Sequence, residues 1–326
     1  MNRLLLALGL VLSLSLSAPL QGHADDDYPT KPIRLIVPYP PGGGTDLSAR
    51  IVADALGRRL GQQVVVENRP GATGAIGSSF VVKAAPDGYT LLWNSTDSII
   101  LVPALREHSP YKVPDDFSFI ARFAENGMVL AINASLPVKT LPEFIDYAKA
   151  HPGELHFGST GIGGSVHMGT LLFEKFSGTQ MIHVPYPGVA PLLVDLLGGR
   201  IEFGLITPIT IAPYVNSDKI RMLAITSQAR HPLLPDIQTL KEAGLPEATT
   251  TVWYGLFGPA NLPAPVMERL QKEVAALADD ATLRAKLEAA GLQVAPVVGL
   301  EFQKNSIAEY DQWKAVAKAD NLSVTQ

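Results

Sequence analysis

Two glycine-rich loops are the segments of this sequence best suited to holding an anion. The first reads VPYPPGGGTD, spans residues 37–46, and joins an apolar segment to an amphipathic one. Glycine lets backbone N–H groups approach a bound anion closely, and the start of a helix carries partial positive charge. Thr45 alternatively serves only as a cap of the following helix. The predicted ligand-binding residues of this loop are Gly43, Gly44, Thr45 and Asp46.

The second loop, LHFGSTGIGGSVHM at residues 155–168, repeats the order of strand, glycine-rich loop and helix. In open α/β sheets such loops lie at the carboxyl ends of strands, beside the crevice where ligands bind. Two of them therefore predict a cleft with an anion-holding loop on each side. The residues that we expect to contribute from the second loop are Ser159, Thr160, Gly163, Ser165 and His167.

The ends of further strands should complete this crevice. The segment LITP places Thr207 there, and Tyr39 and Tyr186 occupy matching VPY segments. These tyrosines either line the walls or pack at strand ends, and the sequence leaves both alternatives open. The strand GYTLLWN and the two residues after it should present Trp93, Asn94, Ser95 and Thr96.

Several kinds of chemistry are disfavoured by motifs that the sequence lacks. GGGTD has no lysine where a P-loop needs one, and glycines at 71, 74 and 77 miss the dinucleotide-binding spacing. No G-x-S-x-G, H-E-x-x-H or C-x-x-C motif occurs. His156, His167 and His183 lack carboxylates at metal-ligand spacing, so we interpret them as structural or hydrogen-bonding residues. We predict no catalytic residue, no metal and no cofactor.

The elements that must position the first loop follow a β-α-β-α-β order. IRLIVPY, QVVVEN and GYTLLWN read as strands, and the amphipathic segments at residues 45–61 and 74–86 read as helices. This order predicts a parallel, doubly wound α/β sheet. The pattern restarts near Met128 and predicts a second α/β domain. Three C-terminal helices then need a sheet to cover, and we expect them to return to the first domain.

The first 24 residues are predicted to be a secretory signal peptide. They contain an early Arg3, then an apolar run, then small residues that end at Ala24. The run is short for a membrane span and is broken by serines. No cysteine follows it, which excludes a lipid anchor. We therefore predict cleavage near Ala24 and a periplasmic location. The formal charge of −5 and the lack of a basic run disfavour nucleic acid as a partner.

Five motifs, in order, resemble the extracytoplasmic binding receptors of tripartite tricarboxylate transporters, the Bug proteins. They are VPYPPGGGTD, VENRPGATGAIG, APDGYTLL, LHFGSTGIGGSVHM and HVPYPG, and the resemblance extends over nearly the whole mature chain. It implies an α/β, two-domain periplasmic-binding-protein-like fold with a ligand cleft between the domains. With the pattern above, it implies a domain I of residues 25–127 and 255–326 and a domain II of residues 128–254.

The resemblance also implies a function, which is to bind a small carboxylate between the two strand–loop–helix units, partly through ordered water. The receptor would act as a monomer, without enzymatic activity, and would deliver its ligand to membrane permease subunits. Ile162, Gly164 and Pro187 stand where the family commonly has Asn, Ser and Lys. The second loop is therefore less polar than is typical, which favours a ligand of more apolar or aromatic character.

Three questions stay open at this level. The ligand could be citrate, a C4-dicarboxylate, an amino acid or an aromatic acid, because backbone N–H groups recognise only the carboxylate. The receptor could instead be a sensor subunit that signals to a membrane kinase. The chain should cross between domains near Gly127–Met128 and near Val252–Gly255, and these crossings form either a hinge or a rigid connection.

Overall fold

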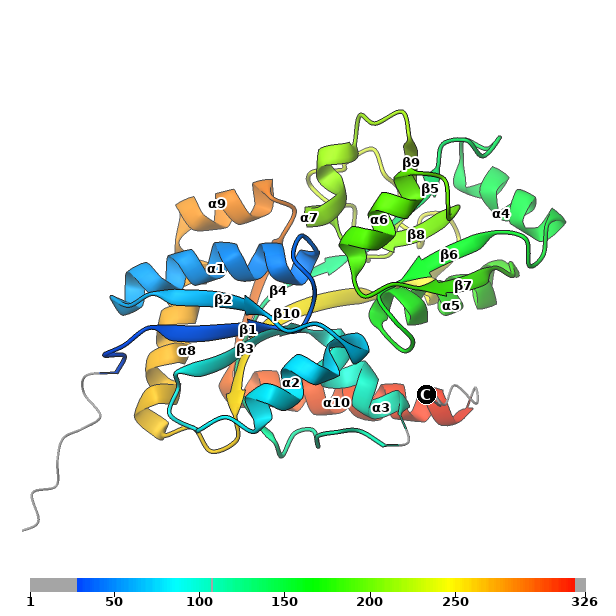
Figure 1. The fold of residues 1–326 in the computed structure, drawn as a ribbon. Coiled ribbons are helices and arrows are strands. Elements are labelled where there is room, and N and C mark those ends of the chain that lie inside the picture. The colour runs from blue at the N-terminus through cyan, green and yellow to red at the C-terminus, as the bar shows by residue number, and fades with distance from the viewer. Residues whose placement is uncertain (1–27, 107, 320–326) are drawn as a thin grey trace, which may run out of the picture.

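The computed structural model describes residues 28–106 and 108–319, which form two α/β units, each built on its own sheet (Figure 1). The predicted signal peptide lies outside the described residues. The first sheet contains, in spatial order, β11 (Gln293–Val298), β4 (Phe117–Gly127), β10 (Thr251–Pro259), β3 (Thr90–Ser95), β1 (Ile33–Val37) and β2 (Val64–Asn68). The second sheet contains β7 (Ile182–Pro185), β6 (His156–Ser159), β8 (Phe203–Ile206), β5 (Val129–Asn133) and β9 (Ile220–Ile225).

The first sheet is mixed rather than wholly parallel. β1 pairs in parallel with β2 and β3, as the β-α-β-α-β pattern predicts. β10 is antiparallel to both β3 and β4, and β11 is antiparallel to β4. The sequence pattern does not predict β4, because Arg122, Glu125 and Asn126 interrupt its apolar run. The expectation of a parallel sheet is therefore correct for three strands and wrong for the other three.

Helices cover both faces of the first sheet, and the C-terminal ones complete this cover. α8 packs on β4 and on α1, and α10 packs on β4 and on α3, which confirms their predicted return. The helices of this unit are α1 (Gly44–Leu60), α2 (Ala75–Val82), α3 (Val102–Leu105), α8 (Ala264–Asp279), α9 (Ala281–Ala289) and α10 (Gly299–Ala319).

The second unit has a smaller core around stacked aromatic rings. Phe144 lies 5.5 Å from Phe203, and Phe173 lies 5.6 Å from the same ring. These rings hold α4 and α5 against β8. The helices here are α4 (Leu141–Ala150), α5 (Ser165–Ser177), α6 (Val189–Leu197) and α7 (Pro208–Ile211).

The chain passes between the two sheets twice, and one threonine ties the passages together. The first passage is the single residue between β4 and β5, Met128. Its N–H donates to Thr226 Oγ1 at 2.8 Å, and the Thr226 hydroxyl donates to the Thr250 carbonyl at 2.6 Å. β10 begins at Thr251, four residues before the predicted domain boundary, and its first residues pair with β4. The exact domain boundaries stay a prediction.

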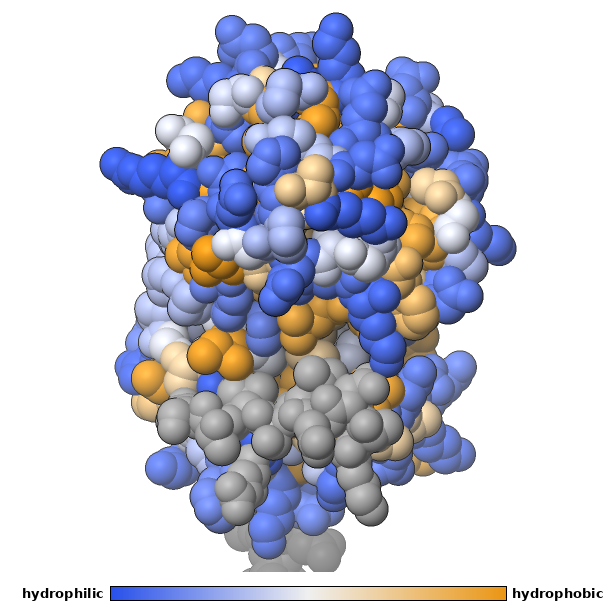
Figure 2. All heavy atoms as spheres, turned by 90° about the vertical axis from the view of Figure 1, so that its right-hand side faces the viewer, coloured by the Kyte–Doolittle hydropathy of each residue, from blue (hydrophilic) through white to orange (hydrophobic). Residues whose placement is uncertain are grey.

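The outer face of the second unit is mostly hydrophilic. Figure 2 shows this side of the molecule, on which hydrophobic side chains lie in separate groups among polar ones. Among residues 28–106 and 108–319, no helix combines the length and the apolar character that a membrane crossing requires.

Candidate functional site

A small cavity lies between the two units, where the glycine-rich loops meet. Its volume is about 40 Å³, which is room for about three water molecules. Several side chains and backbone segments predicted from the sequence line it, namely Tyr39, Gly43, Gly44, Thr45, Ser95, Thr160, Ser165 and Thr207. The structure thus brings together eight predicted residues from both units. Their role in binding stays a prediction.

The first loop presents the start of α1 to this cavity. The helix begins at Gly44 after the N-cap Gly43, and no side chain caps it. Thr45 is therefore not a helix cap. The first N–H groups of a helix have no partner within the helix, so those of Gly44 and Thr45 are suited to an anion.

Asp46 stabilises the first loop through hydrogen bonds and does not line the cavity. Its side chain is almost completely buried and accepts hydrogen bonds from the Gly42 N–H at 3.0 Å and from Asn68 Nδ2 at 2.8 Å. Arg50 adds an ion pair at 2.9 Å. Burial acts to raise the pKa of Asp46, but the bonds from Arg50, Asn68 and Gly42 together lower it below the ordinary value. Asp46 is therefore held as a carboxylate that fixes the loop.

Gly44 is required by close packing across the cavity. A Cβ atom at this position would overlap the Tyr254 hydroxyl and would lie 2.7 Å from Thr207 Oγ1. Tyr254 comes from β10 and Thr207 from the end of β8, so both units approach the backbone of α1 here. Only glycine fits at this position without displacing one of these two hydroxyl groups.

The second loop presents the start of α5, but a carboxylate of the chain already occupies it. Asp97 comes from the turn of π-helix at Asp97–Leu101 that follows β3. Its Oδ1 accepts from the Ser165 N–H at 3.0 Å, and its Oδ2 accepts from Thr160 Oγ1 at 3.2 Å. Thr160 and Ser165 therefore face the cavity with these two donors engaged.

Three predicted residues of the second loop, Ser159, Gly163 and His167, are not among the residues that line the cavity. Ser159 Oγ lies 2.5 Å from His183 Nε2, and the Gly163 N–H donates to His167 Nδ1 at 3.1 Å. The rings of His167 and His183 stack at 4.2 Å, with Phe157 4.9 Å from His183. Burial, with a smaller effect of His183, lowers the pKa of His167 to about 4, and burial also lowers the pKa of His183. Both rings are therefore neutral supports at pH 7.

Three further predicted residues lie away from the cavity. Trp93 is completely buried, and its indole N–H donates to Ser48 Oγ at 2.9 Å. Asn94 is equally buried and donates to Ser78 Oγ at 3.0 Å. The Tyr186 hydroxyl donates to Asp195 at 2.9 Å. The placements of Trp93 and Asn94 differ from the expected ones because helices cover both faces of β3, and that of Tyr186 differs because its hydroxyl is bonded to Asp195 of α6.

The start of α6 forms a third side of the cavity that sequence reasoning missed. Gly188 and Val189 line it, and a Cβ atom at Gly188 would lie 3.0 Å from Pro40 of the first loop. The segment HVPYPGVAP repeats the order of strand, glycine and helix, so the sequence does contain a pattern that indicates Gly188. Asp97 and Tyr254 also line the cavity, and no motif indicated them.

The two units touch across the cavity. Thr73 Oγ1 of the first unit donates to the Ile162 carbonyl of the second unit at 3.4 Å, and the two bonds to Asp97 also cross between units. A ligand larger than a few water molecules can enter only if the units move apart.

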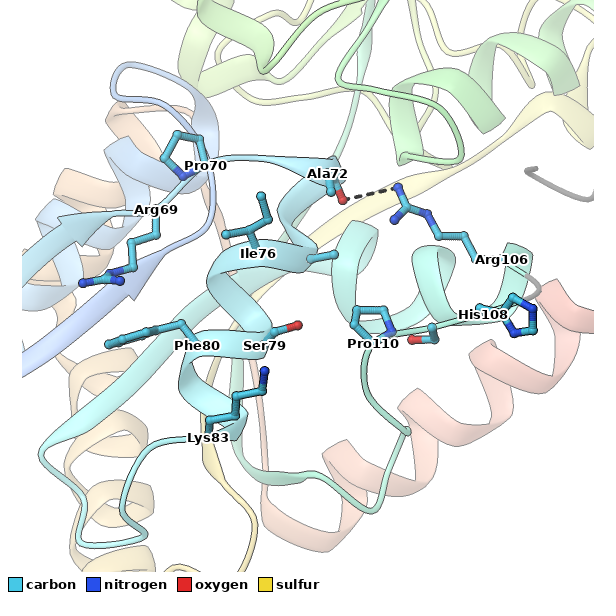
Figure 3. A pocket seen from close by; sticks show the side chains of 12 residues that line it. Arg69, Pro70, Ala72, Ile76, Ser79, Phe80, Lys83, Arg106, His108 and Pro110 are labelled. Atoms are coloured by element: carbon cyan, nitrogen blue, oxygen red, sulfur yellow. Dashed lines mark hydrogen bonds between the residues drawn. The ribbon is translucent and has the colours of Figure 1, made fainter. Parts of the chain in front are cut away.

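A larger, open groove of about 820 Å³ lies on the first unit alone (Figure 3). Figure 3 shows Arg69, Ile76 and Lys83 on one side and Arg106 on the other, with Arg106 bonded to the Ala72 carbonyl at 3.3 Å. Arg69 is paired with Glu67 at 2.6 Å and stacks on Phe80. Neither glycine-rich loop contributes to this groove, so the cavity between the units is the better candidate site.

The fold and the cavity define a two-domain solute-binding protein. The profile of the tripartite tricarboxylate transporter family receptor, TctC, matches residues 48–322, and the chain belongs to this family. Its members are periplasmic binding proteins that bind solutes and do not catalyse reactions. The chain is 36% identical to protein BugT of Bordetella pertussis over 276 residues, which is 84% of each chain.

Solved structures show the same fold. The periplasmic binding protein BugD is 28% identical, with a TM-score of 0.86 over 91% of this chain and 99% of that one. An R. palustris protein solved with adipate is 32% identical, with a TM-score of 0.86 over 89% of this chain and 97% of that one. MatC from Rhodopseudomonas palustris, with bound malate, is 28% identical, with a TM-score of 0.82 over 89% of this chain and 99% of that one.

Proposed function

We propose that this receptor captures a small carboxylate in the cavity between its two domains and delivers it to the permease subunits of a tripartite tricarboxylate-type transporter. The observation that carries the proposal is the convergence of α1 and α6, from opposite units, on one cavity through Gly44 and Val189. Helix starts attract carboxylates through unpaired N–H groups and partial positive charge.

A further observation supports a carboxylate. Among the described residues that line the cavity there is no lysine, arginine or histidine, so the anion would be held by N–H and hydroxyl groups alone. The structural neighbours solved with adipate and with malate each hold a carboxylate. Three or four charge-assisted hydrogen bonds of about 1.5–3 kcal/mol each are enough for micromolar affinity, about −8 kcal/mol, after the cost of closure.

The test begins with mass spectrometry of the ligand that stays bound through gentle purification. Calorimetry with that ligand should then show that Thr45→Ala weakens binding about tenfold to a hundredfold, because alanine keeps the backbone N–H but loses the one charge-assisted hydrogen bond that the Thr45 hydroxyl would donate. Thr45 lines the cavity in the first turn of α1 and is not its cap.

Thr140→Ala is the matched control, because Thr140 Oγ1 caps α4 by accepting from the Glu143 N–H. This control should lose about 1 kcal/mol of stability and keep its affinity. Unchanged affinity in Thr45→Ala, or a retained ligand that carries no carboxylate, would contradict the proposed function.

A further inference from the structure

Asp97 is a buried acidic side chain in the wall of the candidate cavity. It is 4% exposed, and each carboxylate oxygen accepts one hydrogen bond, from the Ser165 N–H and from the Thr160 hydroxyl. Both partners are donors, which suits the ionised, acceptor-only form of the side chain. A carboxylate of the protein thus lies where the second glycine-rich loop would otherwise hold an anion.

This carboxylate has no cationic partner within the described part of the chain. None of the ion pairs found there includes Asp97, and the cavity is lined without lysine, arginine or histidine. Burial raises the pKa of Asp97 above its ordinary value, and the hydrogen bonds from Ser165, Thr160 and Tyr39 oppose this rise without cancelling it. A buried charge is costly unless it is paired, so a cation in the cavity would be strongly favoured there.

The position of Asp97 also restricts where a ligand carboxylate can bind. The start of α5 is already neutralised by Asp97, which leaves the start of α1 at Gly44 and the start of α6 at Val189. The cavity is small, so the far end of a short ligand must lie near Asp97. A second carboxylate at that end would meet a like charge away from bulk water, where repulsion is strongest.

We propose that Asp97 makes this site selective for a small carboxylate that also carries a cationic group, such as the ammonium group of an amino acid. This inference rests on the proposed function, since it assigns the ligand class of the same cavity. The ligand carboxylate lies at the starts of α1 and α6, and its ammonium group donates to Asp97. Dicarboxylates are discriminated against by the charge of Asp97.

Matched ligands of equal chain length test the proposal on the unaltered protein at pH 7.5. The first set is β-alanine, propionate and malonate, and the second is 4-aminobutyrate, butyrate and succinate. Alanine and 2-aminobutyrate cover the α-amino arrangement. Calorimetry should show that the best aminocarboxylate binds at least a hundredfold more tightly than the dicarboxylate of its length, with the plain monocarboxylate between them.

Asp97→Asn tests the residue itself, because it removes the charge and keeps the size and one acceptor oxygen. It should weaken the aminocarboxylate at least tenfold and strengthen the dicarboxylate at least threefold. A merely structural role for Asp97 would move both affinities in the same direction. Thr45→Ala is the matched control, since it alters the proposed carboxylate contact and should weaken all ligands together.

The outcomes separate this inference from the proposed function. If dicarboxylates bind the unaltered protein as tightly as the aminocarboxylates, the selectivity is refuted, while carboxylate binding stands. If Asp97→Asn strengthens every ligand equally, Asp97 competes with the ligand carboxylate at α5, which also overturns the inference. If none of these ligands binds and the ligand retained on purification is not a carboxylate, the proposed function itself fails.

Discussion

The stacked pair His167 and His183 predicts a loss of stability in mild acid. The folded state holds the pKa of His167 at about 4, mainly by burial, whereas the unfolded chain has the ordinary value of 6.5. Between these two values the unfolded chain binds the extra proton, so stability is complete above pH 6.5 and falls as the pH drops toward 4. His183, whose pKa is also lowered, acts in the same direction.

The size of the effect follows from the two pKa values of His167. Their difference corresponds to about 3 kcal/mol in total, of which about 2 kcal/mol is lost between pH 7 and pH 5. Urea unfolding followed by circular dichroism should therefore give a free energy of unfolding that is lower at pH 5 by about this amount. Stopping at pH 5 limits the contribution of carboxylates with an ordinary or lowered pKa, which titrate at lower pH. Burial raises the pKa of Asp97, so this carboxylate acts in the opposite direction.

His167→Phe isolates the contribution of one ring. Phenylalanine keeps the stacking on His183 and loses the acceptor for the Gly163 N–H, which should cost about 1 kcal/mol at every pH. The pH-dependent loss should become smaller by about 2 kcal/mol. His151→Phe is the matched control, because its ring stacks on Tyr147 at 4.2 Å, outside this cluster. An unchanged pH dependence in His167→Phe would refute the reasoning.

Two other predictions concern the cavity and its closure. Gly44→Ala should weaken ligand binding at least tenfold and cost about 1–3 kcal/mol of stability, because the new methyl group overlaps the Tyr254 hydroxyl. Gly43→Ala is the control, because its Cβ atom would contact only Val189, at 3.9 Å or more. Calorimetry and urea unfolding measure both variants, and equal effects of the two changes would contradict the explanation. The passages at Met128 and Thr250 should act as a hinge, so small-angle scattering should show a radius of gyration that falls when the ligand saturates the protein. A radius of gyration that stays constant would contradict the hinge and indicate a rigid pair of domains.

The sequence by itself determined the local elements that make the site possible. Glycines between an apolar strand and an amphipathic helix predict a helix start that faces a crevice, and Gly43, Gly44 and Thr45 lie in such a loop. The C-terminal helices were correctly assigned to the first sheet, because their apolar faces had no other sheet to cover. These features depend on residues close together in the chain, so their pattern is visible without coordinates.

The tertiary structure alone decided which side chains reach the cavity. Successive residues of a strand point to opposite faces, and helices cover both faces of β3, so Trp93 and Asn94 are both buried in the core. Asp97 is one of 31 acidic residues in the sequence, and no local pattern distinguishes it. It becomes part of the site only because the turn after β3 brings it to Ser165, which is 68 residues away along the chain. Contacts between such distant residues depend on how the two units pack, and the sequence pattern carries no signal of that packing.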